Sequence, residues 1–170
     1  SQAETLLVQT GTLLVEEALH PGAMVATGNA GRHAAPWGVY PCAGDDEWCV
    51  VTVRDDGDWR RLRGALGDPR WAADPDLACA AERIARRAEI DARLAAWTRD
   101  RSPRALTAIL QAAGVPAGFM QRPTELEHDP HLEARDVFRT FAMPDGSPRT
   151  IENAPFRADH MSPLDAIYAL

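Results

Sequence analysis

The basic side chains of this sequence are all arginines, 18 in number, because lysine is absent. They are outnumbered by 25 acidic side chains, and the net charge at neutral pH is −7. A nucleic-acid-binding domain needs a basic surface to offset phosphate charge. The acidic balance therefore argues against a nucleic-acid partner, while the lack of lysine indicates no function by itself.

Cysteine is the second scarce residue, with three in the chain: Cys42, Cys49 and Cys79. Their spacing matches no metal-binding motif, and an odd, sparse set favours reduced thiols over a disulfide framework. We expect Cys42 and Cys49 on either side of a hairpin turn. Both are interpreted as structural, because a nucleophilic thiol needs an electropositive, partly exposed setting and acidic residues precede Cys49.

Long apolar segments are also missing. No run of the sequence approaches the roughly 18 apolar residues that a membrane span requires, and the first residues lack the basic start and apolar centre of a signal peptide. We therefore expect a cytoplasmic protein with no membrane partner. The length of 170 residues and the hydrophobic content of 45% match one globular domain, or one and a fraction, with a buried core.

Helices and strands alternate along the chain. Apolar residues at helical spacing predict helices over residues 4–19, 59–66, 80–98 and 103–113. Strand-forming runs are found over residues 50–53, 115–120, 137–143 and 149–152, with single helical turns expected after Thr124 and over 130–134. This mixture predicts the α+β class, with short antiparallel strands and hairpins packed against helices.

Local signals predict how several helices begin, end and pack. Asp58 is a plausible N-cap of the second helix, and Gly114 is a typical C-terminal stop for the fourth. The helix over 4–19 has an apolar face that needs a cover, and the helix over 80–98 has two apolar stripes. Three arginines of that longer helix are interpreted as solvated charge: Arg83, Arg86 and Arg87.

The most informative stretch runs from Gly28 to Val53. A loop of small residues leads into a short strand, a Gly-Asp-Asp turn follows, and a β-branched strand leaves. This order predicts a loop carried on a hairpin. With little side-chain bulk, such a loop lets its backbone approach a ligand closely, and the alternative is a plain connecting loop.

Two motifs in this order resemble the family III CoA-transferases, also called the CaiB/BaiF family. The first joins Gly28-Asn29 to Pro36, Gly38-Val39-Tyr40-Pro41-Cys42 and Glu47-Trp48. The second joins Leu110-Gln111-Ala112-Ala113-Gly114-Val115-Pro116-Ala117-Gly118 to Glu125-Leu126, Asp129-Pro130-His131-Leu132 and Ala134-Arg135. The resemblance extends from about residue 3 to about residue 157, and it covers only the later part of a much longer family member.

The resemblance implies an enzyme that moves CoA between an acyl-CoA and a carboxylic acid, with the CoA thioester as substrate and no covalently bound cofactor. This chain would supply a linker helix (1–24), the small domain that closes the active site (25–157) and a C-terminal tail (158–170). The resemblance also implies a homodimer, in which the small domain of one subunit covers the large domain of the other. The family's catalytic aspartate belongs to an earlier part without counterpart here, so the catalytic residues stay unknown and the chain alone is expected to be inactive.

The resemblance places the small-residue loop close to the acyl-CoA. The residues expected there are Gly28, Asn29, Gly31, Arg32 and His33. Backbone N–H groups of the loop could cradle the thioester or exclude water from a reactive intermediate. Arg32 and His33 could meet a phosphate or carboxylate, or stand solvated, and Tyr40 could face the ligand, although packing within the hairpin is favoured.

Other interpretations of the chain stay open. His128 and His131 flank Asp129, but no third ligand follows at metal-type spacing, so no metal site is expected. The chain could be a non-catalytic interaction module that pairs with a separate large subunit. It could also belong to an α-methylacyl-CoA racemase-like enzyme, whose His/Asp pair moves a proton at the α-carbon. The two motifs favour the transferase branch, and the acyl and acceptor identities are not specified by the sequence.

Overall fold

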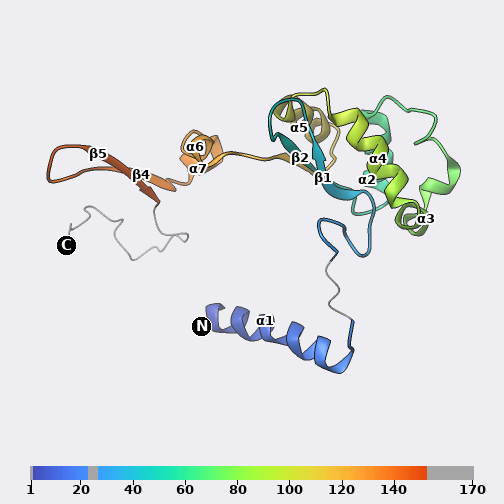
Figure 1. The fold of residues 1–170 in the computed structure, drawn as a ribbon, viewed down its shortest axis with the longest axis horizontal. Helices are drawn as coiled ribbons and strands as arrows, with labels where there is room; N and C mark the ends of the chain where they lie inside the picture. Colours follow the sequence, from blue (N-terminus) through green and yellow to red (C-terminus); the bar gives the residue numbers. More distant parts are fainter. Residues whose placement is uncertain (1, 23–26, 153–170) are drawn as a thin grey trace. The chain divides into compact units, whose positions relative to one another are not determined.

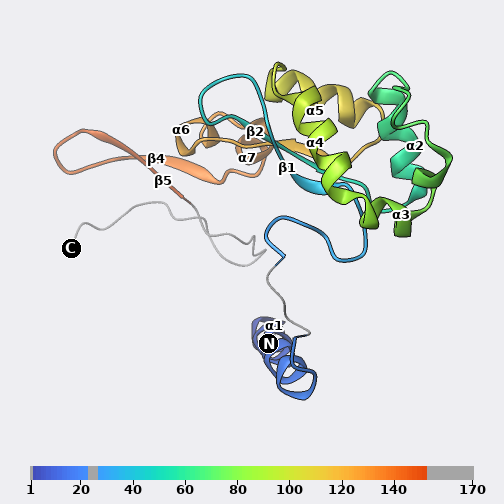
Figure 2. The same ribbon diagram turned by 45° about the vertical axis from the view of Figure 1, so that its right-hand side comes forward.

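The computed structural model describes residues 2–22 and 27–152. The chain divides into two compact units, residues 1–120 and 121–170, whose elements are drawn in Figure 1 and, after a rotation, in Figure 2. Both units combine helices with short antiparallel strands, which confirms the α+β class. The predicted tail over 158–170 lies outside the described residues.

The first helix, α1, spans Gln2–Leu19 and ends where the sequence predicts. Gly22, with φ +88°, follows the helix, and its N–H donates to the Glu17 carboxylate at 2.8 Å. Several apolar side chains of α1 are exposed, including Val8 at 70% and Leu14 at 77%. No helix within the described ranges is long and apolar enough to cross a membrane.

Three antiparallel strands form the sheet of the first unit, in the order β1 (Trp37–Pro41), β2 (Trp48–Thr52) and β3 (Ala117–Phe119). The predicted hairpin is confirmed, with Tyr40 opposite Cys49 and Cys49 opposite Phe119 in register. The turn between β1 and β2 uses two left-handed residues, Gly44 and Asp46. Pro116 precedes an edge strand, where a missing N–H does not interrupt the ladder.

Five helical segments follow β2 and surround the core of this unit (Figures 1 and 2). They are α2 (Asp56–Ala65), the 3₁₀ helix η1 (Pro75–Ala78), α3 (Ala80–Ala85), α4 (Arg87–Thr98) and α5 (Pro103–Ala112). α4 packs against β1, while α5 packs against β2 and β3. The largest hydrophobic side chains enclosed between them are Tyr40, Trp59, Leu62, Leu77, Ile90, Leu94, Leu106 and Leu110.

Three predicted helix boundaries are wrong. The helix expected over 80–98 is two helices, because Arg86 leaves the helical conformation with φ −98° and ψ +20°. Asp55, not Asp58, caps α2, since the Asp55 carboxylate accepts the Asp58 N–H at 2.7 Å. Thr124 lies inside a helical turn whose N-cap is Arg122.

The second unit contains two short helices, α6 (Pro123–Leu126) and α7 (Pro130–Ala134), and a two-stranded sheet. Asp129 caps α7 by accepting the N–H groups of His131 and Leu132. The strands β4 (Phe138–Ala142) and β5 (Pro148–Glu152) form the hairpin that the sequence predicts. Gly146 adopts φ +80° in its turn, which glycine tolerates without steric cost.

Candidate functional site

The predicted loop lies directly before β1 and is largely exposed. Gly28, Asn29, Arg32 and His33 are exposed, while Gly31 is half-buried. Gly28 has φ +59°, and the next residues form a turn in which the N–H of residue 30 donates to the carbonyl of residue 27 at 3.1 Å. The structure therefore gathers the five predicted loop residues on one segment of the first unit.

The end of the loop is buried and fixed by arginine side chains from α3 and α4. Arg87 donates from Nη2 to the carbonyl oxygens of Gly31 and Ala34, the latter at 3.1 Å. Arg83 donates from Nε to the carbonyl oxygen of Ala35 at 2.9 Å. Two guanidinium groups thus hold the peptide carbonyls of residues 31, 34 and 35, where the loop leads into β1.

Arg83 is fully buried, which corrects its interpretation as solvated charge. Its Nη1 donates to the carbonyl oxygens of Leu77 and Ala78 at 2.9 and 3.0 Å, and its Nη2 donates to Asp56 at 2.7 Å. The guanidinium also lies 5.6 Å from the ring centroid of Trp59. A buried charge is tolerated when it is paired and hydrogen-bonded in this way, so Arg83 joins η1, α2 and the loop.

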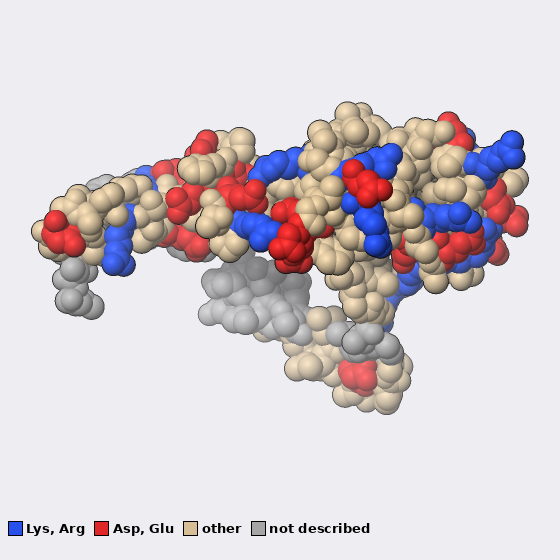
Figure 3. Space-filling model, turned by 45° about the horizontal axis from the view of Figure 1, so that its top comes forward, with Lys and Arg blue, Asp and Glu red and all other residues tan. Residues whose placement is uncertain are grey.

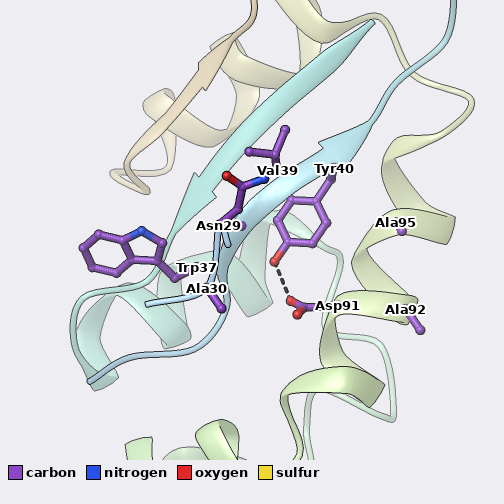
Figure 4. Close-up of a pocket in the computed structure, with 9 residues that line it drawn as sticks. Asn29, Ala30, Trp37, Val39, Tyr40, Asp91, Ala92 and Ala95 are labelled. Atoms are coloured by element: carbon purple, nitrogen blue, oxygen red, sulfur yellow. Dashed lines mark hydrogen bonds between the residues drawn. The ribbon is translucent and has the colours of Figure 1, made fainter. Parts of the chain in front are cut away.

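A pocket of about 350 Å³ lies between the loop, β1 and α4. Figure 4 shows Asn29 and Ala30 of the loop, side chains of β1, and Asp91, Ala92 and Ala95 of α4 around it. The Tyr40 hydroxyl points toward α4 and donates to Asp91 Oδ1 at 2.6 Å. The pocket therefore combines an apolar wall with one carboxylate that is oriented by a tyrosine.

Tyr40 is buried, as the preference for packing predicts, and it also lines this pocket. Burial raises the pKa of Tyr40 far above its usual value, and the hydrogen bond to Asp91 raises it further. The nearby Arg87 charge opposes this increase only in part. The hydroxyl stays protonated and is suited to donate a hydrogen bond, not to act as a base.

A second hollow of about 300 Å³ shares Trp37 with this pocket and is lined in addition by Gly28 and Val50. The indole packs against Gly31 so closely that a Cβ at position 31 would lie 2.8 Å from the ring. Only glycine fits this contact without movement of the ring or the loop. Gly31 therefore serves the packing of the loop on β1.

The cysteines and histidines supply no second chemical centre in the described part of the chain. Cys42 and Cys49 are buried, and burial raises the pKa of both thiols, which is the reverse of what a nucleophile requires. His128 and His131 belong to the other unit. Over residues 2–22 and 27–152, no cluster of three His, Cys, Asp or Glu side chains could hold a metal ion.

Charges of both signs are interspersed on the face shown in Figure 3. Among the ion pairs of the first unit, the Arg86 guanidinium meets Asp74 at 2.6 Å and Glu89 at 3.0 Å. It is half-buried, not fully solvated. Neither partner belongs to the loop, which is held instead by the neighbouring Arg87.

Comparison with known proteins gives a consistent family assignment. The sequence profile described as CoA-transferase family III matches residues 1–164. A probable CoA-transferase of Mycobacterium tuberculosis is 42% identical over 152 residues, and a succinyl-CoA–D-citramalate CoA-transferase of Chloroflexus aurantiacus is 36% identical over 119 residues. These matches cover 85% and 70% of this chain.

A solved structure supports the same assignment. The crystal structure of a CaiB/BaiF family protein from Brucella suis superposes with a TM-score of 0.73 at 25% identity, over 88% of this chain. The match spans 38% of that protein, and the two relatives above are spanned over 18% and 29% of their lengths. The similarity thus covers nearly the whole chain but a minor part of each relative. The chain belongs to CoA-transferase family III.

Proposed function

We propose that this chain is the small domain of a family III CoA-transferase and closes the active site over an acyl-CoA bound by a larger part of the enzyme. The proposed reaction moves CoA between an acyl-CoA and a carboxylic acid. The observation that carries the proposal is the exposed loop over 28–33, anchored through its buried end beside a pocket. The family profile matches this whole region.

The relatives support a transferase over a racemase. The Chloroflexus relative is named as a succinyl-CoA–D-citramalate CoA-transferase, and a 28% identical relative from Agrobacterium fabrum is named as a succinate–glutarate CoA-transferase. Both names describe transfer between dicarboxylic acids. A free carboxylate on such a substrate is an anion that Arg32, and His33 when protonated, would attract.

The proposed roles of the loop residues follow from their place on a largely exposed loop. Gly28, Asn29 and Gly31 present backbone close to the thioester, while Arg32 and His33 meet an anionic group of the acyl-CoA or acceptor. Tyr40 borders the site through the pocket it lines. The reacting carboxylate would come from the larger part of the enzyme, as the family resemblance implies. A carboxylate nucleophile splits acyl transfer into easier steps.

The proposed assembly is a homodimer, or a pair with a separate large domain, in the cytoplasm. Residues 1–24 would act as linker helix, 25–157 as the small domain and 158–170 as the tail. The exposed apolar side chains of α1, among them Val8, Leu14 and Leu19, support a partner on that helix, since burying apolar surface is the main drive of association.

Calorimetry with succinyl-CoA tests the proposal. The ligand is titrated into this chain alone, and then into its mixture with the separately produced large domain of the Chloroflexus relative. We expect binding only in the mixture, weakened roughly tenfold by Arg32→Gln through loss of a charge-assisted contact. The matched control is Arg70→Gln, an exposed arginine on a turn of the same unit, which should leave binding unchanged.

Each other outcome points elsewhere. Binding by this chain alone would mean that the pocket is complete here and that the small-domain role is wrong. Association with the large domain without any succinyl-CoA binding would favour the non-catalytic interaction module. Exchange of the α-hydrogen of a 2-methylacyl-CoA with solvent, without transfer of CoA, would favour a racemase-like enzyme.

A further inference from the structure

Arg87 holds the loop at two points that lie on either side of Arg32 and His33. It is the first residue of α4, and a single nitrogen, Nη2, donates to the carbonyl oxygens of both Gly31 and Ala34. The two acceptors are separated in sequence by Arg32 and His33 alone. The distance across this two-residue tip is therefore set by one guanidinium.

The contact belongs to a wider attachment of α4 to the loop and β1. One turn after Arg87, Asp91 accepts the Tyr40 hydroxyl at 2.6 Å. Two turns further, the Thr98 hydroxyl donates to the carbonyl oxygen of Pro41 at 2.7 Å. Positions 87, 91 and 98 recur at helical spacing and so share one face of α4. The same face carries Ile90 and Leu94, which are buried in the core, so the helix that holds the loop is itself fixed by the core.

We propose that Arg87 is a positioning residue that presents Arg32 and His33 to the acyl-CoA, an inference that rests on the proposed function of the loop. Arg87 acts through the backbone of Gly31 and Ala34 and needs no contact with substrate. The planar guanidinium suits this task, because its donors have fixed directions, whereas a lysine ammonium is a compact point charge on a flexible stem.

Trypsin supplies a direct readout, because the tip contains the Arg32–His33 bond and the chain has no lysine. Cleavage there requires the tip to leave its folded geometry. Under native conditions, peptides ending at Arg32 are quantified by mass spectrometry in the full chain and its variants. We expect Arg87→Gln to raise cleavage at Arg32 roughly tenfold, from loss of two hydrogen bonds, and Arg87→Lys to restore part of the protection.

The matched control is Arg86→Gln, which removes the adjacent arginine, whose bonds go to Asp74 and Glu89. It should leave cleavage at Arg32 unchanged. The melting temperature of each variant is measured alongside. Equal cleavage at Arg32 in wild type and Arg87→Gln would overturn the proposal, as would an increase of the same size in Arg86→Gln, since the effect would then be general destabilisation.

The same variants in the mixture with the large domain connect the anchor to ligand binding. We expect Arg87→Gln to weaken succinyl-CoA binding, while Arg86→Gln binds as wild type does. Faster cleavage at Arg32 with unchanged binding would overturn the positioning role. Failure of the wild-type mixture to bind succinyl-CoA would overturn the proposed function. Cleavage at Arg32 reports on the Arg87 contact without any ligand, so it distinguishes that result from a failure of the anchor.

Discussion

Asp58 illustrates at the residue scale how this protein buries charge. Its carboxylate is fully buried and accepts the Arg54 N–H at 3.0 Å and the Arg54 Nε at 2.7 Å. Arg61 supplies a further donor. Hydrogen bonds from Arg54 hold the pKa of Asp58 well below its ordinary value of 3.8, despite the opposing effect of burial.

Replacing this carboxylate should change both the stability and its pH dependence. A depressed folded-state pKa contributes stability that is present above 3.8 and is lost as the pH falls through the lower folded value. We expect Asp58→Asn to lower the free energy of unfolding by roughly 1–3 kcal/mol at pH 7 and to flatten its decline below about pH 4. Urea unfolding at a series of pH values measures both effects.

The control for this prediction is Asp100→Asn, which removes an exposed carboxylate. It should follow the wild-type curve within a few tenths of a kcal/mol. If Asp58→Asn lost no more stability at pH 7 than at pH 3, the ion pairs with Arg54 and Arg61 would not contribute as argued.

At the element scale, one glycine inside α2 and one just after it are expected to affect stability in opposite directions. Gly64 lies inside the helix, with open space where a Cβ would stand. Gly67 follows the helix with φ +82°, and its N–H donates to the Gly64 carbonyl at 3.0 Å. Glycine costs stability in a helix interior but is favoured where φ is positive.

The same substitution should therefore act in opposite directions at the two positions. We expect Gly64→Ala to stabilise the protein by roughly 0.5–1 kcal/mol and Gly67→Ala to destabilise it by about 1 kcal/mol. Tryptophan fluorescence during urea unfolding reports both, since Trp59 lies on this helix. Destabilisation of similar size by both variants would show that packing, not backbone conformation, decides the outcome.

Elements with a local signal could be predicted from the sequence. Pro103 and Gly114 bracket α5, and Gly146 marks the turn between β4 and β5. The break at Arg86 has no such signal, because no proline or glycine stands there. Its side chain instead meets Asp74, twelve residues earlier, and a contact of that kind becomes visible only in the folded chain.

The candidate site divides in the same way. The loop and Tyr40 could be placed on a hairpin, because small residues and β-branched strands carry local patterns. The anchoring roles of Arg83 and Arg87 could not be predicted. Their acceptors are backbone carbonyls 48 to 56 residues away, and a carbonyl oxygen is present at every residue, so no acceptor stands out in the sequence.

On the scale of the whole molecule, the buried core belongs to one unit. Every buried hydrophobic residue in the described ranges lies between Ala34 and Val115, and none of residues 121–152 is buried. All five tryptophans also precede residue 121. The second unit depends on short helices and a two-stranded sheet, which is marginally stable by itself.

The two units should therefore unfold at different urea concentrations. We expect the far-UV circular dichroism signal to fall in two steps, with the second unit unfolding first, while tryptophan fluorescence reports only the later step. Ile151→Ala should shift the first step alone. Val51→Ala, in the core of the first unit, should lower the free energy of unfolding in the second step by roughly 2 kcal/mol. Coincident transitions in both signals would contradict independent unfolding.

The anchor of the loop has one more consequence, which concerns ionic strength. Arg87 donates to peptide oxygens, which carry no net charge and do not titrate near neutral pH. Dissolved salt screens the attraction between partly exposed ions, such as Arg86 and Asp74, but weakens a hydrogen bond to a neutral acceptor far less. We therefore expect the hydrogen bonds between Arg87 and the loop to persist from dilute buffer to concentrated salt. Ion pairs such as Arg86–Asp74 should weaken over the same range.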